Sequence, residues 1–198
     1  MTIKTTAAFA TILCATVAAA QPPAAPPPVA LVLSNQFDQT ADLADARGAV
    51  VVLVYGDRRA TDACKALGEQ LHVFWHPAAK GRPPAEAHAA PVVGLAGLRP
   101  GQPSPDVRVV PVACCGKVPG PVRAVIRAQI AKGAPEVPVW LDFADTMKTS
   151  FGQTPGMPNV VVIDAAGRLR ATVNGAPDQA ALDGLVKTVQ VLRFEAAK

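Results

Sequence analysis

The chain has 198 residues and a formal net charge of +4; half of its residues are apolar and 17% are charged. No run of Lys or Arg forms a stripe that could follow a phosphate backbone, and aromatic residues make up only 5%, so we expect no nucleic-acid partner. The length suits one domain with a core of ordinary size.

The first twenty residues have the pattern of an export signal. Lys4 supplies a positive charge, the apolar stretch from Thr6 to Val17 follows, and Ala18-Ala19-Ala20 precedes Gln21. This predicts a signal peptide over residues 1–20 and a periplasmic or secreted protein. The apolar stretch is too short to span a membrane, so no integral membrane segment is expected after cleavage. Cys14 follows Leu13 rather than a small residue, which favours a cysteine lost with the signal over a lipid anchor.

Residues 21–36 are expected to form a Pro/Ala-rich spacer, followed by one domain over residues 37–198. The β-branched run from Ala49 to Tyr55 predicts a buried central strand. A helix is predicted from Thr61 to Phe74, with Thr61 as its N-cap. Such a strand and helix begin a βαβ unit, and ligands of parallel sheets lie beyond the strand ends, so the loop over residues 56–64 is the expected site.

The middle of the chain is predicted to contain a long insertion at about residues 78–105, a strand over 106–113 and a helix that ends at Lys132. The helix is expected to turn four apolar side chains inward and Arg123 and Arg127 outward; the four are Val122, Val125, Ile126 and Ile130. A short extended piece near Trp140, a short helix up to Phe151 and a final amphipathic helix capped by Asp178 complete the predicted elements.

A hairpin near the end of the chain is the most specific pattern. Pro158 precedes the run Asn159 to Ile163, and the turn residues 164–168 lead into a second alternating run from Leu169 to Val173. A proline directly before a strand is a common place for a cis peptide bond, which we expect before Pro158.

This hairpin, together with the strand that ends at Tyr55, resembles the thioredoxin-like superfamily, in its redoxin, peroxiredoxin-like or envelope thioredoxin branch. The resemblance covers roughly residues 37–192 and implies an α/β fold with a mixed central sheet, flanking helices and a cis-proline hairpin. It also implies a binding groove at Tyr55, Met157 and Pro158. Envelope thioredoxins carry Cys-x-x-Cys five positions after the aromatic residue, but those positions hold Ala60 and Ala63 here.

Peroxiredoxins offer a second template, Pro-x-x-x-Thr-x-x-Cys, which matches Thr61 and Cys64 but has Asp57 in place of the proline. On this resemblance Cys64 is a reactive thiol, Thr61 helps to position a peroxide, and Arg58 supplies positive charge. The competing interpretation is that Cys64 is a small buried residue of the helix, three positions before Leu67.

Cys114 and Cys115 follow the second predicted strand. Either residue could resolve an oxidised Cys64 or form a structural bridge with it, and a bridge between the two adjacent cysteines or two buried thiols are further alternatives. His72 and His76 have a spacing that suits a metal, but no Cys-x-x-x-Cys accompanies them, so we expect ordinary histidines and no metal or other cofactor.

Two functions therefore remain. The first is an exported, divergent thiol redox or peroxiredoxin-like protein that uses Cys64 with Cys114 or Cys115 and has a thiol reductant as its partner. The alternative is a non-catalytic thioredoxin-like module that binds a peptide or protein beside Pro158.

Overall fold

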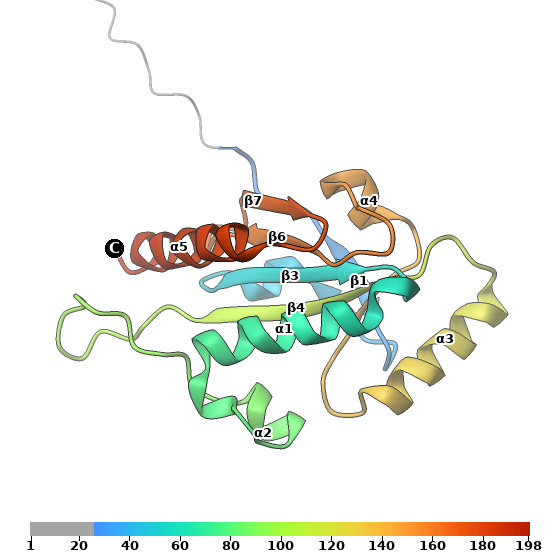
Figure 1. The fold of residues 1–198 in the computed structure, drawn as a ribbon, viewed down its shortest axis with the longest axis horizontal. Coiled ribbons are helices and arrows are strands. Elements are labelled where there is room, and N and C mark those ends of the chain that lie inside the picture. Colours follow the sequence, from blue (N-terminus) through green and yellow to red (C-terminus); the bar gives the residue numbers. More distant parts are fainter. Residues whose placement is uncertain (1–25) are drawn as a thin grey trace, which may run out of the picture.

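A seven-stranded mixed sheet runs through the computed structural model, which describes residues 26–198 (Figure 1). The predicted signal peptide, Cys14 and the start of the expected spacer lie outside the described residues. The strands lie in the order β2-β1-β5-β4-β3-β6-β7. Their bounds are β1 Val32–Asn35, β2 Thr40–Asp42, β3 Val50–Gly56, β4 Val107–Cys114, β5 Trp140–Asp142, β6 Asn159–Ile163 and β7 Leu169–Asn174.

Within residues 26–198, five α-helices and three short 3-10 helices accompany the strands. The α-helices are α1 Thr61–Trp75, α2 Pro84–His88, α3 Gly120–Gly133, α4 Thr146–Phe151 and α5 Gln179–Ala196, and the 3-10 helices are η1 Leu43–Ala46, η2 Arg58–Ala60 and η3 Pro77–Ala79. No helix among residues 26–198 has the length and apolar character needed to cross a membrane.

Strand β3 is an interior strand of the sheet, between β4 and β6, and it is buried as its unbroken β-branched sequence predicted. Every one of its residues is buried. It pairs in parallel with β4 on one side and antiparallel with β6 on the other. Because side chains alternate along a strand, β3 divides the core into two layers. Val50, Val52 and Val54 pack beneath α1 and α5, whereas Val51, Leu53 and Tyr55 pack on the opposite face against η1 and α4.

The hairpin of β6 and β7 is confirmed, and Asp164 holds its turn. The Asp164 carboxylate accepts hydrogen bonds from the backbone N–H groups of Ala166 and Arg168 at 3.0 and 2.8 Å. It also pairs with the side chains of Arg168 and Arg170. Gly167 has a φ of 83°, which a residue with a Cβ adopts only with strain.

The peptide bond before Pro158 is trans, as are all peptide bonds in the described part of the chain, so the expected cis bond is not found. The backbone already reverses direction in the preceding residues. Met157 donates its N–H to the carbonyl of Thr154 at 3.3 Å, and the Asn159 side chain donates to the carbonyl of Met157 at 2.9 Å. With the turn held by these bonds, the chain enters β6 through a trans bond.

Three further expectations are corrected. Residues 32–35, placed in the spacer, form β1, because Leu31 is buried and β1 pairs with β2 and β5. In α3, Val122 and Val125 were predicted to point inward, but both are exposed. Arg127 instead turns toward the domain and forms an ion pair with Asp38 at 2.9 Å. The helix has no buried residue, so no apolar face of α3 is buried in the core.

Candidate functional site

The carboxyl ends of β3 and β4 face the loop that leads into β6, and Cys64 lies at this place. The register puts Gly56, the last residue of β3, beside Ala113 of β4, while Tyr55 pairs with Asn159 of β6. Helix α1 begins directly after η2, so Cys64 stands in its first turn. Ligand sites of α/β folds lie at this end of the strands, which makes it the candidate functional site.

The sulfur of Cys64 rests against the backbone of Gly56. A Cβ atom placed on Gly56 would lie 2.7 Å from Cys64 Sγ, 2.8 Å from Ala60 Cβ and 3.2 Å from the carbonyl oxygen of Met157. Distances below 3.0 Å are not tolerated between such atoms. Gly56 therefore leaves no room for a Cβ, because Cys64, Ala60 and the Met157 carbonyl already occupy the space beside its Cα. Cys64 fills the space between the end of β3 and the start of α1.

Asp57 ties the loop after β3 to the loop before β6. Its carboxylate accepts hydrogen bonds from Arg59 N and Gly156 N, both at 2.9 Å. The bond from Gly156, with support from Arg59, outweighs the effect of partial burial and holds the pKa of Asp57 below its ordinary value. A carboxylate is thus permanently present near Cys64 at neutral pH.

Asn159 fixes the loop before β6 from beneath. The Asn159 side chain is fully buried. Its Oδ1 accepts hydrogen bonds from Thr154 N at 2.8 Å and Gly175 N at 3.0 Å. Its Nδ2 donates to the backbone carbonyls of Met157 and Tyr55. Both backbone polar groups of Met157 are therefore engaged within the chain. The Met157 side chain is 46% exposed. Contacts that an outside molecule makes at Met157 must involve its side chain.

The Cys64 thiol is protonated at neutral pH. Burial and the nearby Asp57 carboxylate raise the pKa of Cys64 to about 11. A helix start normally favours the thiolate, but here those two effects are larger. At pH 7 about one thiol in 10⁴ is ionised, since each pKa unit is a factor of ten. This environment is the opposite of the electropositive surroundings that activate a catalytic cysteine.

Cys114 lies on the other face of the sheet from Cys64. Cys114 packs with Tyr55 and Val112, whereas Cys64 packs in the layer beneath α1. Cys64, Cys114 and Cys115 are all free thiols. Burial, with the Asp142 carboxylate nearby, raises the pKa of Cys114 far above its ordinary value and that of Cys115 to about 11. The structure brings the three thiols to one end of the sheet but forms no bridge among them.

The other predicted site residues point elsewhere. Thr61 is the first residue of α1 rather than its cap, and its hydroxyl donates to the carbonyl of Arg58 at 2.9 Å. The Arg58 side chain is exposed. Tyr55 is fully buried in the layer opposite Cys64, where its hydroxyl donates to the carbonyl of Gly152 at 2.6 Å, so it does not line a groove with Met157. Pro158 is buried beneath the exposed Met157.

Gly56 and Asp57 lie in the loop that was expected to hold the site, but their structural roles were not predicted, and Asn159 was not named as a site residue. Asp57 carried a local signal, because an aspartate two residues before a helical turn commonly accepts a backbone N–H. Gly56 and Asn159 carried none, since the Met157 carbonyl near Gly56 and the bond from Asn159 to Tyr55 come from segments about one hundred residues away. His72 and His76 contact the backbone carbonyls of Ala87, Ala90 and Val107, and within residues 26–198 no group of three His, Cys, Asp or Glu lies together that could hold a metal ion.

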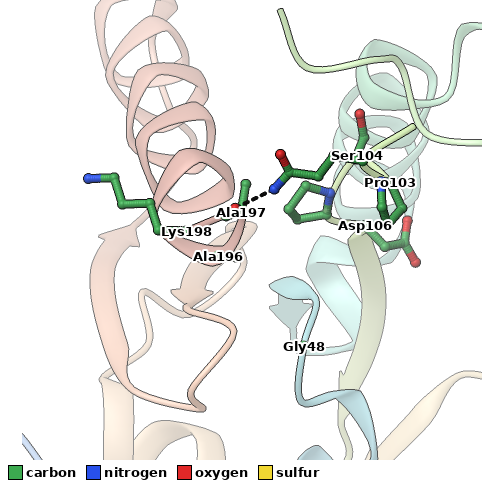
Figure 2. A pocket seen from close by; sticks show the side chains of 9 residues that line it. Gly48, Pro103, Ser104, Asp106, Ala196, Ala197 and Lys198 are labelled. Atoms are coloured by element: carbon green, nitrogen blue, oxygen red, sulfur yellow. Dashed lines mark hydrogen bonds between the residues drawn. The ribbon is translucent and has the colours of Figure 1, made fainter. Parts of the chain in front are cut away.

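A hollow occurs at the opposite end of the sheet (Figure 2). Residues before β3 and β4, Gly48 and Asp106 among them, line it together with the end of α5, and Gln102 donates a hydrogen bond across it to the carbonyl of Ala197. The hollow is open and contains no cluster of titratable side chains. Cys64 is not part of it.

Comparisons with known proteins agree with the topology. No protein-family model matches the chain, and no curated protein matches it by sequence. Among solved structures, the exposed lipoprotein thioredoxin of Streptococcus pneumoniae superimposes with a TM-score of 0.50 at 18% identity, covering 80% of this chain and 98% of its own. A protein of Chlorobium tepidum described as thiol:disulfide interchange protein DsbE gives a TM-score of 0.50 at 15% identity, covering 86% and 94%. The chain therefore has a thioredoxin-like fold, with Ala60 and Ala63 where the resemblance placed a Cys-x-x-Cys pair.

Proposed function

We propose that this chain is a non-catalytic thioredoxin-like binding module whose contact surface is the loop pair, defined as residues 57–60 and 154–157. The observation that carries the proposal is the state of Cys64. Its thiol is protonated, it is packed against Gly56, and neither Cys114 nor Cys115 is bonded to it. A thiol in this setting contributes packing, and the exposed parts of the loop pair remain for recognition.

The loop pair is suited to side-chain recognition. Arg58, Arg59 and Met157 are all exposed, and Gly156, which precedes Met157, lies near the Arg59 side chain. Methionine is a flexible apolar side chain that adapts to varied partners. The Asp57 and Asn159 hydrogen bonds hold the loops in one arrangement, which lowers the entropy cost of binding. The expected partner is an extended peptide or a protein of the cell envelope.

A peptide-display selection on the whole chain tests the binding function. We expect selected peptides to bind wild type and to lose at least about tenfold in affinity to Met157→Asp, since a carboxylate replaces an apolar contact. Val191→Asp is the matched control, because Val191 is 54% exposed on α5 and lies outside the loop pair. Equal binding by wild type and Met157→Asp, or failure to select any binder, would reject the proposal.

A thiol redox function is the second candidate, with Cys64 as the reacting thiol and Cys114 or Cys115 as its resolving partner. It is supported by the clustering of three thiols at one end of the sheet and by the names of the two structural neighbours. Such a protein would need a thiol reductant as its partner.

Alkylation kinetics separate the two functions. Iodoacetamide labelling of the wild-type protein, followed by peptide mass spectrometry, gives a rate for each cysteine. We expect Cys64 at pH 7 to react about a hundredfold more slowly than a free cysteine peptide, because burial and Asp57 raise its pKa to about 11. Pretreatment with peroxide should leave that rate unchanged. Rapid labelling, or loss of labelling after peroxide, would favour the redox function instead.

A further inference from the structure

Four exposed apolar side chains gather where the last turn of α1, the segment after α2 and the outer face of α5 meet. They are Phe74, Val93, Val191 and Phe194, with exposed fractions of 54%, 40%, 54% and 42%. Monomeric proteins rarely expose large apolar groups together, and such a group commonly marks a contact surface. We call these four residues the apolar patch. It lies outside the candidate functional site.

Val93 joins the two helices of the apolar patch. Its N–H donates to the carbonyl of Trp75 at 2.6 Å, and its own carbonyl accepts a hydrogen bond from Arg193 Nη2 at 2.6 Å. Trp75 follows Phe74 on α1, and Arg193 precedes Phe194 on α5. The patch therefore continues from one helix to the other across Val93.

The helical positions of these residues turn them toward one surface. On α1, His72 contacts α2 through the carbonyl of Ala87, and Phe74, two residues later, lies on the opposite side of the helix. In Figure 1, α2 lies on the side of α1 that is away from α5. The buried residues of α5 face the sheet, so Val191 and Phe194 lie on its outer face.

Basic side chains border the apolar patch. Lys187 precedes Val191 by four residues and Lys198 follows Phe194 by four, so both lie in line with the outer face of α5. Arg99 and Lys198 line one hollow at the end of α5, and Figure 2 shows the Lys198 side chain pointing away from the neighbouring hollow. All three are exposed, and none forms an ion pair with a carboxylate of residues 26–198.

The two carboxylates of α5 do not neutralise this border. Glu195 forms an ion pair with Arg170 of β7 at 2.7 Å. Asp183 lies one turn farther from the patch than Lys187, and its carboxylate accepts a hydrogen bond from Gln179. The outer face of α5 thus combines apolar and basic groups around the patch, which complements a surface that is apolar beneath an anionic layer.

A second copy of the chain fits this face poorly. In an antiparallel pairing of two α5 helices centred on Val191 and Phe194, Lys187 of each copy would lie opposite Lys198 of the other copy. Like charges in such positions repel. An anionic partner avoids this repulsion.

We propose that the apolar patch and its basic border dock the domain on an anionic phospholipid surface. The apolar side chains enter the boundary between headgroups and acyl chains, while Arg99, Lys187 and Lys198 contact the lipid phosphates. The loop pair lies at the start of α1 and the patch at its end, so the docked domain keeps the loop pair away from the lipid. This inference does not depend on the proposed binding function.

Vesicle sedimentation with the protein in the form that the cell produces tests the docking. Vesicles of phosphatidylcholine with about one third phosphatidylglycerol are compared with vesicles of phosphatidylcholine alone. We expect the partition coefficient to be at least about tenfold higher for the anionic vesicles, and to fall as salt is added, because salt screens the attraction. Equal partition into the two kinds of vesicle, or partition into neither, overturns the proposal.

Two variants locate the contact. Phe194→Asp should lower the partition coefficient at least about tenfold, because a carboxylate replaces an apolar side chain beside the anionic lipid. Lys187→Glu should weaken binding to the anionic vesicles and leave binding to pure phosphatidylcholine unchanged. Val125→Asp is the matched control, because Val125 is 56% exposed on α3 and lies outside the patch. All variants share the residues before position 26, and circular dichroism checks that each is folded.

Wild-type partition by Phe194→Asp would show that the patch is not the docking surface and would overturn the proposal. A dimer that forms without lipid and that Phe194→Asp abolishes, together with no partition into vesicles, would assign the patch to a second copy and overturn it too. Val191→Asp separates this inference from the peptide-binding proposal. It should weaken partition into vesicles while selected peptides still bind, because Val191 belongs to the patch and not to the loop pair.

Discussion

Replacing Gly56 by alanine tests the packing at the candidate site directly. The added methyl group would lie 2.7 Å from Cys64 Sγ and 2.8 Å from Ala60 Cβ, about 1 Å inside ordinary carbon and sulfur contacts. The Ala60 Cβ has no side-chain torsion that could move it away, Cys64 Sγ could move only by changing its χ1 rotamer, and the third contact, the Met157 carbonyl at 3.2 Å, is backbone. Either α1 or the loop before β6 must therefore move away from β3.

The expected cost of Gly56→Ala is about 2 kcal/mol in the free energy of unfolding. Overpacking of a filled core destabilises a protein by roughly 1–3 kcal/mol. Part of this loss is offset because alanine reduces the conformational entropy of the unfolded chain relative to glycine. For a domain of this size that free energy corresponds to a fall of about 4–8 °C in Tm. Urea unfolding followed by circular dichroism measures the change, and the m-value checks that the transition keeps its cooperativity.

A double-mutant cycle with Cys64→Ala isolates the sulfur contact. In the Cys64→Ala background the shortest contact of the new methyl group is absent, so the penalty for Gly56→Ala should fall by about 1 kcal/mol. Gly68→Ala in the middle of α1 is the control, because a Cβ there meets no atom within 4 Å. An unchanged penalty in the Cys64→Ala background, or no penalty for Gly56→Ala, would show that the sulfur does not rest on β3.

Two further predictions concern buried polar groups. Tyr55→Phe should lower stability by about 1–2 kcal/mol, because the carbonyl of Gly152 and the Asn174 side chain lose their donor; Thr188→Ala on the exposed face of α5 should change it by less than about 0.5 kcal/mol. Asp164→Asn should lower the free energy of unfolding by about 2 kcal/mol at neutral pH, and it should reduce the loss of stability that the wild type shows at acid pH. Burial would raise the pKa of Asp164, but bonds from Arg168 and Arg170 outweigh it and lower that pKa, so its contribution is lost as the pH falls below 3.8. A wild-type chain with undiminished stability between pH 4 and pH 2 would contradict this assignment, as would a loss of stability at Tyr55→Phe no larger than at Thr188→Ala.

Local patterns predicted the central elements well. The β-branched runs of β3 and β6, the turn around Asp164 and the apolar stripe of α1 each lie within a short stretch of sequence, and their periodicity decides their structure. The cap of α5 at Asp178 was found in the same way, and its side chain accepts from Ala181 N. Helix α3 shows the limit of such reasoning, because Val122 and Val125 are exposed although the pattern placed them inward.

The sequence by itself determined the α/β architecture, the hairpin and the absence of a Cys-x-x-Cys pair from the described domain. Tertiary structure alone decided what Cys64 and Pro158 do. Which face of the sheet a thiol occupies depends on the pleat of β4 and its register with β3, and this separates Cys114 from Cys64. The protonation of Cys64 depends on Asp57 and on burial by Gly56, and the trans bond at Pro158 accompanies the bonds of Asn159. The bonds from Gly156 to Asp57 and from Asn159 to Tyr55 join segments about one hundred residues apart, so no local pattern contains the assembled site.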